Sequence, residues 1–242
     1  MNEPRVAVII DADNISGDHA EGVLEEAGKQ GRVIIRRIYG DWTNPSGKKW
    51  KKVLADLAIA PIQQFQNTTG KNATDSALII DAMDLLHANA AEVFCIVSSD
   101  ADFTRLASRL REDAKTVVGI GASKTPRAFV RACDRFIFLE NLQSDEVAET
   151  PDAPGAPEKR RRKPRAPVNE AGKLLRRAFD DLEGDDGVVF LGSLGTSLLK
   201  LDPAFDSRTY GFKKLVDLVE ADPGFDVARH PTKNARVVQR KR

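Results

Sequence analysis

The sequence predicts an α/β domain built on a parallel β-sheet with helices on both faces, followed by a small, mostly helical domain. Two observations support this prediction. Strand and helix signals alternate with short connections through residues 5–142, which is typical of a parallel sheet whose strands are joined by helices. Residues 143–169 then lack apolar periodicity and contain five prolines, and helical periodicity resumes at residue 170. We therefore expect two folded domains separated by a disordered linker.

The elements of the first domain follow from short apolar runs and from helical spacing of apolar residues. The apolar runs predict strands at 5–11, 33–40, 60–65, 93–99, 116–121 and 135–139. The spacing predicts helices at 17–30, 46–58, 74–89, 102–113 and 124–133. The third helix is well supported, because Thr74 can cap it and apolar residues recur at Leu78, Ile79, Ala82, Leu85 and Leu86.

The second domain is predicted from a shorter pattern. Apolar residues between 174 and 182 lie on one helical face, and residues 194–199 and 210–219 predict two more helices. Residues 225–227 are expected to form a wing strand, and this order of elements resembles a winged helix-turn-helix. The predicted division is a first domain at 1–143, an acidic-then-basic linker at 144–168, a winged-helix-like domain at 169–232 and a basic tail at 233–242.

Three acidic residues sit where predicted elements begin or end. Asp11 and Asp100 each follow an apolar strand, and Asp75 opens the third helix. In open α/β sheets, ligands bind at the carboxyl ends of the strands. Carboxylates gathered there repel one another unless a cation lies between them. We therefore predict a Mg²⁺ or Mn²⁺ site that activates water for phosphodiester cleavage. In the alternative interpretation, each acid is solvated or caps the following helix.

Polar neighbours of these acids have two interpretations each. Asn14 either orients a water or phosphate oxygen, or caps the helix that follows. Asp102 is either a fourth acid of the site or a partner of the helix dipole. Ser98 and Ser99 either donate to phosphate or position Asp100, or are ordinary strand-end polarity. Asp81 lies six residues after Asp75, about 240° around a helix, so it is not expected on the same face.

Basic residues form candidate phosphate-binding segments. The run from 159 to 165 holds six bases and no aromatic residue, which predicts salt-sensitive binding without sequence readout: Lys159, Arg160, Arg161, Arg162, Lys163 and Arg165. Lys48 and Lys49 precede Trp50 on a basic helix, which is either a strand-binding surface or a core helix with Trp50 inside. Lys71 is either a phosphate contact or a solvated loop residue.

Composition narrows the class of protein. The apolar runs are too short to span a membrane, so no membrane partner is expected. The N-terminus lacks a signal-peptide pattern, and the two cysteines, Cys95 and Cys133, are expected to be buried thiols. The three histidines share no ligand spacing, so no zinc site is expected. These features indicate a cytoplasmic protein.

Three segments together resemble the motifs of the NYN domain, a PIN-like (LabA-like) ribonuclease family. They are Val6–Asn14, Lys71–Asp81 and Val97–Phe103, and the resemblance covers about residues 4–142. It implies a Rossmann-like α/β/α sandwich and metal-dependent cleavage of RNA that leaves a 5′-phosphate and a 3′-hydroxyl. It also implies that the family's functional positions fall on Asp11, Asn14, Asp75, Asp100 and Asp102.

The C-terminal segment, about 168–232, resembles a LOTUS (OST-HTH) domain. The residues that support this are Leu174–Leu182, Val189–Gly195 and Tyr210–Leu215. The resemblance implies a module that binds RNA or a protein partner and so recruits the nuclease domain.

Two other functions stay open at this point. The first is a non-catalytic RNA-binding or adaptor protein with the same fold. The second is a haloacid-dehalogenase-type phosphatase, because Asp11 and Asp13 follow an apolar strand and the first Asp would be the nucleophile. That class requires Thr or Val at position 15, where this chain has Ile15, and it does not explain Asp75.

Overall fold

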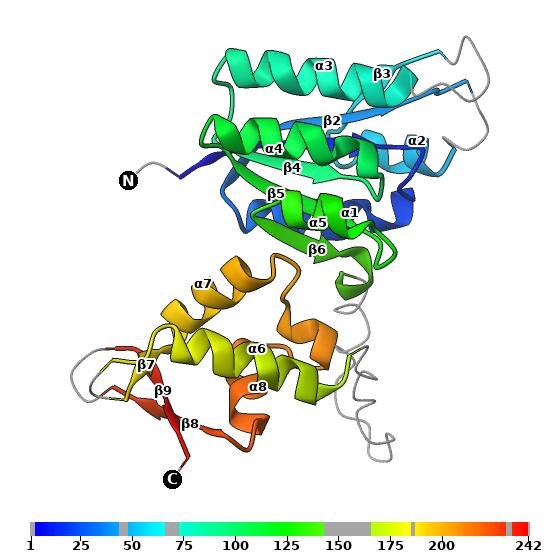
Figure 1. The fold of residues 1–242 in the computed structure, drawn as a ribbon. Helices are drawn as coiled ribbons and strands as arrows, with labels where there is room; N and C mark the ends of the chain where they lie inside the picture. The colour runs from blue at the N-terminus through cyan, green and yellow to red at the C-terminus, as the bar shows by residue number, and fades with distance from the viewer. Residues whose placement is uncertain are drawn as a thin grey trace, which may run out of the picture. The chain divides into compact units, whose positions relative to one another are not determined.

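The computed structural model describes residues 3–43, 48–65, 73–142, 166–184, 187–230 and 234–241 (Figure 1). The chain divides into two compact units, Met1–Glu146 and Val147–Arg242. Most of the predicted linker, and all six bases at 159–165, lie outside the described residues. In the part of the chain that is described, no helix is long and apolar enough to cross a membrane.

The first unit is a six-stranded parallel sheet, as predicted. Its strands are β1 (Arg5–Asp11), β2 (Arg32–Gly40), β3 (Ala60–Gln63), β4 (Val93–Val97), β5 (Thr116–Gly121) and β6 (Arg135–Phe138). The strand order is β3-β2-β1-β4-β5-β6, and every neighbouring pair is parallel. The order reverses between β1 and β4, so the carboxyl ends of these two strands flank the crevice where open α/β sheets bind ligands.

Helices cover both faces of this sheet (Figure 1). They are α1 (Ala20–Gly28), α2 (Lys48–Leu54), α3 (Ala73–His87), α4 (Thr104–Glu112) and α5 (Arg127–Ala132). Right-handed crossovers place α1 and α2 on one face and α3, α4 and α5 on the other. Two predicted helices begin instead as 3₁₀ turns, η1 (Gly17–His19) and η3 (Ala101–Phe103), which Ser16 and Asp100 cap. Helix α5 starts later than predicted, because Pro126 has an extended ψ of 135°.

Alternation along β1 decides where Asp11 points. Val6, Val8 and Ile10 pack in one core cluster with Val23 of α1. Successive side chains of a strand point to opposite faces, so Asp11 lies on the face covered by α3 and α4. Alternation along β4 likewise puts Ser98 on the same face as Asp11, because Val93, Cys95 and Val97 belong to the α1-side core.

Trp50 belongs to the hydrophobic core, which selects one of its two interpretations. It is 1% exposed, and its indole Nε1 donates to the carbonyl of Ile15 at 2.9 Å. Both cysteines are also buried and free, as expected. The side chains of Lys48 and Lys49 lie outside the described residues, so the basic face predicted around Trp50 stays a prediction.

The second unit is a small helical domain with a three-stranded antiparallel sheet. Its elements are α6 (Val168–Asp180), β7 (Val189–Phe190), α7 (Leu191–Leu201), η5 (Ser207–Tyr210), α8 (Leu215–Ala221), β8 (Phe225–Arg229) and β9 (Arg236–Arg240). The strand order is β7-β9-β8. Helices α6, α7 and α8 and strands β8 and β9 share one core that includes Leu175, Phe179, Leu194, Leu218, Phe225 and Val238. This agrees with the predicted winged-helix-like domain.

The structure differs from the sequence prediction at two places in this unit. The helix predicted at 210–219 begins only at Leu215, because Gly211 has a φ of +86° and ends the preceding 3₁₀ turn. The segment expected to be a basic tail, 233–242, contains β9, which pairs with both β7 and β8. Val237 and Val238 are buried there, and their burial stabilises the strand despite the surrounding bases.

Candidate metal site at the sheet edge

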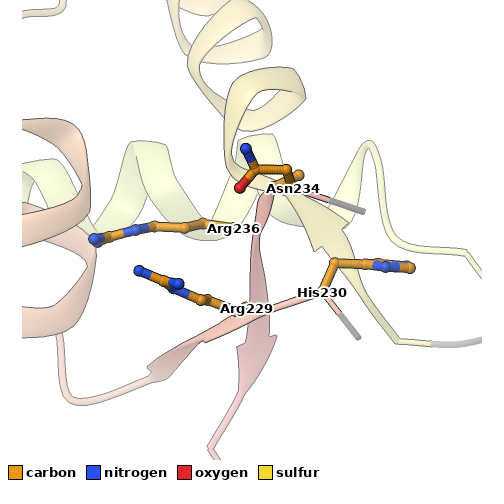
Figure 2. Close-up of a pocket in the computed structure, with 5 residues that line it drawn as sticks. Arg229, His230, Asn234 and Arg236 are labelled. Carbon is orange, nitrogen blue, oxygen red and sulfur yellow. The ribbon is translucent and has the colours of Figure 1, made fainter. Parts of the chain in front are cut away.

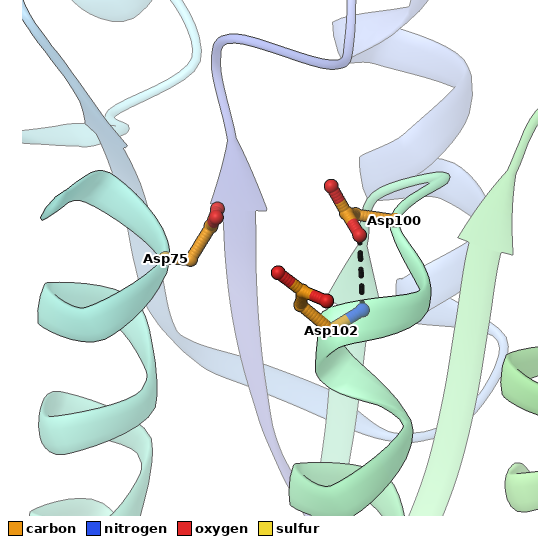
Figure 3. A group of neighbouring side chains, drawn as sticks. All are labelled: Asp75, Asp100 and Asp102. Atoms are coloured by element: carbon orange, nitrogen blue, oxygen red, sulfur yellow. Dashed lines mark hydrogen bonds between the residues drawn. The ribbon is translucent and has the colours of Figure 1, made fainter. Parts of the chain in front are cut away.

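Three carboxylates meet at the carboxyl edge of the sheet. Asp75, Asp100 and Asp102 each offer an oxygen within 4.8 Å of the other two. Figure 3 shows them approaching from α3 on one side and from the turn between β4 and α4 on the other. Two oxygens on opposite sides of one Mg²⁺ lie about 4 Å apart, so small side-chain rotations would let all three reach a single ion.

The turn after β4 brings Asp100 and Asp102 together. Asp100 has an extended backbone (φ −89°, ψ 137°) and caps η3, where its Oδ1 accepts from the backbone N–H of Asp102 at 2.9 Å. Asp100 is half-buried, whereas Asp102 is exposed. One short capping motif therefore delivers two acids of the cluster to the same edge.

Asp11 lies next to this cluster but is held differently. It is fully buried, and its Oδ2 accepts from Asn14 Nδ2 at 2.6 Å and from Ser98 Oγ at 2.8 Å. Its Oδ1 accepts from the backbone N–H of Asp13 at 3.0 Å. Burial raises the pKa of Asp11, and these hydrogen bonds oppose the rise. The prediction that Asp11 itself ligates the metal therefore stays a prediction.

Ser98 connects the two acidic positions. Its Oγ donates to Asp11 and accepts from the backbone N–H of Asp100 at 3.1 Å. Asn14 does not cap the following helix, since Ser16 caps η1, and its Nδ2 donates to Asp11 instead. Its predicted contact with a water or phosphate oxygen stays a prediction. Strand alternation could have identified Ser98 as a partner of Asp11, because the register of β1 and β4 brings these strand ends side by side.

The electrostatics of the cluster favour a cation. Burial, followed by the negative charges of Asp11, Asp100 and Asp102, raises the pKa of Asp75 to about 6. The pKa of Asp75 is raised because the protein places too little positive charge near this carboxyl group to offset the negative charges around it. All of the donors are carboxylate oxygens, which suit Mg²⁺ and Mn²⁺ better than soft metals. The residues present therefore fit a divalent cation of this class.

A second cluster fixes α3 against the sheet. Asp81 of α3 accepts hydrogen bonds from Arg37 Nη1 and from the hydroxyl of Tyr39, both on β2. Tyr39 is fully buried and is the register partner of Asp11. Burial, helped by Asp81, raises the pKa of Tyr39, so its hydroxyl stays a donor. Asp81 is not part of the cluster of Asp75, Asp100 and Asp102, and we infer that its bonds to β2 orient α3.

The predicted nucleic-acid contacts are placed only in part. Ser99 is half-buried, and its Oγ accepts from the backbone N–H of Ala122 at 2.8 Å, which ties the end of β4 to the loop after β5. That loop leads to Lys124 and Arg127, two exposed cations that sequence reasoning missed. The sequence feature that could have identified Lys124 and Arg127 is their position just after the apolar run of β5. Lys71 and the run from 159 to 165 lie outside the described residues.

Comparisons with known proteins identify both units. The family model of the NYN domain matches residues 5–140, and that of the OST-HTH/LOTUS domain matches residues 163–237. No curated protein matches the chain.

Similar solved structures include a protein of unknown function from Vibrio parahaemolyticus. It is 17% identical, with a TM-score of 0.47, and the match covers 56% of this chain and 92% of that one. An uncharacterized protein from Nitrosomonas europaea is 34% identical over 40% of this chain and 91% of its own, with a TM-score of 0.25.

Proposed function

Because this chain belongs to the NYN domain family through residues 5–140, we propose that it is a metal-dependent endoribonuclease. The observation that carries the proposal is the cluster of Asp75, Asp100 and Asp102 at the switch point of the sheet. The OST-HTH/LOTUS domain at 163–237 supports an RNA-related role and is proposed to recruit RNA or a protein partner.

Asp75, Asp100 and Asp102 would hold Mg²⁺ or Mn²⁺. A bound divalent cation supplies positive charge that lowers the pKa of an attacking water and offsets the charge of the scissile phosphate. The chain's own part is to keep the ligands in position. Ser98 sets the backbone at Asp100, and the capping bond of Asp100 fixes Asp102 beside it. Asp11, held by Ser98 and Asn14, adds fixed negative charge that strengthens cation binding.

Lys124 and Arg127 are proposed to bind RNA phosphates that flank the cleaved bond. They follow β5, next to the strand end that carries Asp100, and the bond between Ser99 and Ala122 holds their loop there. An acidic cluster repels the RNA backbone, so cations on the same edge are needed to bring the substrate in. Both side chains are exposed to solvent.

A phosphatase of the haloacid-dehalogenase type is not supported. In that chemistry the carboxylate of Asp11 would attack phosphorus directly. Here Asp11 is fully buried, and both of its oxygens accept hydrogen bonds from Asp13, Asn14 and Ser98. A carboxylate held in this way is a support for the site and not an exposed nucleophile.

The test is cleavage of a labelled single-stranded RNA in Mn²⁺ or Mg²⁺ by wild type, Asp100→Asn and Asp84→Asn. Asp84 is an exposed acid of α3 outside the cluster, so it controls for the loss of one charge. We expect metal-dependent products with 5′-phosphates from wild type and Asp84→Asn, and none from Asp100→Asn. Wild type that cleaves none of several RNAs would favour the RNA-binding adaptor. Equal cleavage by Asp100→Asn would point to a contaminant or to another site.

A further inference from the structure

The hairpin of β8 and β9 in the second unit carries a polar hollow of about 400 Å³ (Figure 2). Arg229, His230, Asn234, Ala235 and Arg236 line it. Of these described residues, Ala235 is the one that is apolar. From the sequence, residues 233–242 were expected to be a basic tail, and no binding role was predicted for Arg229 or His230.

Two arginines face each other across this hairpin. Arg229 and Arg236 are direct register partners in the antiparallel pair, and both are exposed. Figure 2 shows their side chains extending side by side in the same direction. Like charges directly opposite one another in a sheet are destabilising. Arg236 lies 3.8 Å from Glu220, a long contact between two half-exposed side chains that offsets only part of this repulsion.

The other cations of β9 and its end are arranged differently. Arg240 pairs with Asp180 and lies 3.5 Å from Glu183, and its guanidinium sits over the ring of Phe179. Lys241 lies 3.6 Å from Asp226. At that end of the strand, positive charge is therefore used within the fold. At the Arg229 end, two cations are brought together, and among the described residues the counter-charge is Glu220, 3.8 Å from Arg236.

The end of the hairpin is fixed from the opposite side. His230 points away from the arginines and stacks on Phe190 of β7, with ring centroids 5.4 Å apart and planes at 23° (Figure 2). The backbone N–H of His230 donates to the carbonyl of Ala235 at 2.9 Å. These contacts hold the strands that present Arg229 and Arg236, so the two cations are positioned before any ligand arrives.

We propose that Arg229 and Arg236, with the amide of Asn234, form a binding site for the phosphate backbone of single-stranded RNA. A protein partner would require an apolar or aromatic anchor at the centre of its interface, and among the described residues that line this hollow only Ala235 is apolar. A polyanion relieves the repulsion between the arginines and needs no such anchor. The choice of RNA rests on the proposed function, because RNA is the polyanion that the first unit would cleave.

The test compares RNA affinity of the full chain and two double variants in EDTA, so that no cleavage occurs. Arg229→Gln/Arg236→Gln removes the proposed site. Lys173→Gln/Arg177→Gln removes the same charge from exposed positions on α6 of the same unit. Affinity for a fluorescent single-stranded RNA is measured by polarization across a range of salt concentrations. Thermal unfolding is measured alongside to check the fold.

The Arg229→Gln/Arg236→Gln variant, called the wing variant below, is expected to bind the RNA about 25-fold more weakly at 0.1 M salt. Each lost contact with a single-strand phosphate lowers the affinity roughly fivefold at that salt concentration. Its plot of log affinity against log salt should be shallower by about 1.4. The Lys173→Gln/Arg177→Gln variant on α6, called the α6 variant, should bind the RNA with nearly the wild-type affinity. The wing variant should unfold at the wild-type temperature or higher, because the like-charge repulsion is removed.

The proposal is wrong if the wing variant binds RNA as tightly as wild type. It is also wrong if both variants lose the same amount of RNA affinity, or if the wild-type protein binds no RNA. The nuclease proposal is judged separately, from cleavage of a short RNA in Mn²⁺. The wing variant should retain that cleavage, because its acidic cluster is untouched. Wild type that binds RNA through the wing but does not cleave would refute the nuclease and leave this site in place.

Discussion

Replacing Asp75 by Asn should stabilise the metal-free protein while abolishing cleavage. The unfolded chain ionises Asp75 near pH 3.8, whereas burial and the charges of Asp11, Asp100 and Asp102 raise its pKa to about 6 in the folded state. The folded state therefore holds this proton more tightly. The contribution of protonated Asp75 to the free energy of unfolding is fully present below about pH 3.8 and is lost as the pH rises through 6.

The size of the effect follows from that rise in pKa. About two pH units correspond to roughly 3 kcal/mol at 1.36 kcal/mol per unit. Asp75 is only part-buried, and solvent screening reduces this to about 1 to 1.5 kcal/mol. Asn keeps the shape and removes the charge. Asp75→Asn should therefore raise the free energy of unfolding by about that amount at pH 7.5, and by much less at pH 4.

Urea unfolding in EDTA, followed by tryptophan fluorescence, measures this directly. Both tryptophans of the chain, Trp42 and Trp50, lie in the first unit, so the signal reports on that unit alone. Asp84→Asn on the same helix controls for general charge removal. If Asp75→Asn is no more stable than Asp84→Asn at pH 7.5, the carboxylates do not repel one another as inferred, and the electrostatic case for a cation fails.

Three further predictions concern the groups around the cluster. Ser98→Ala removes a donor to buried Asp11 and should cost about 1–3 kcal/mol in unfolding free energy while lowering cleavage; full cleavage would show that this bond does not organise the site. Tyr39→Phe removes the hydroxyl bonded to Asp81 and should lower kcat with little change in KM; a change confined to KM would contradict a positioning role. Saturating Mn²⁺ should raise the thermal midpoint of wild type by mass action but not that of Asp100→Asn, and equal shifts would place the ion elsewhere.

The sheet and the placement of the acids were predictable because they depend on short-range patterns. Apolar runs that end in an acid define β1 and β4, and two-residue alternation fixes the face on which Asp11 lies. The partners within the site were harder to predict. Asp11, Asp75 and Asp100 were predicted as ligands, with Asp102 as a fourth acid in one of two interpretations, and the three oxygens within 4.8 Å of one another belong to Asp75, Asp100 and Asp102. That outcome depends on the capping turn at Asp100, a geometry that apolar periodicity does not encode.

The second unit shows why a count of basic residues does not locate a binding surface. Strand β9 was missed because its two buried valines, Val237 and Val238, are adjacent and break the expected alternation. Successive side chains of a strand point to opposite faces of the sheet, and Val238 packs in the helical core while Val237 is buried on the other face. The register of β9 against β8 shows that its arginines have different surroundings. Arg240 is paired with acids of the fold, while Arg236 is set opposite Arg229. The pairing of the strands, more than the number of basic residues, therefore decides which arginines are available to bind RNA phosphates.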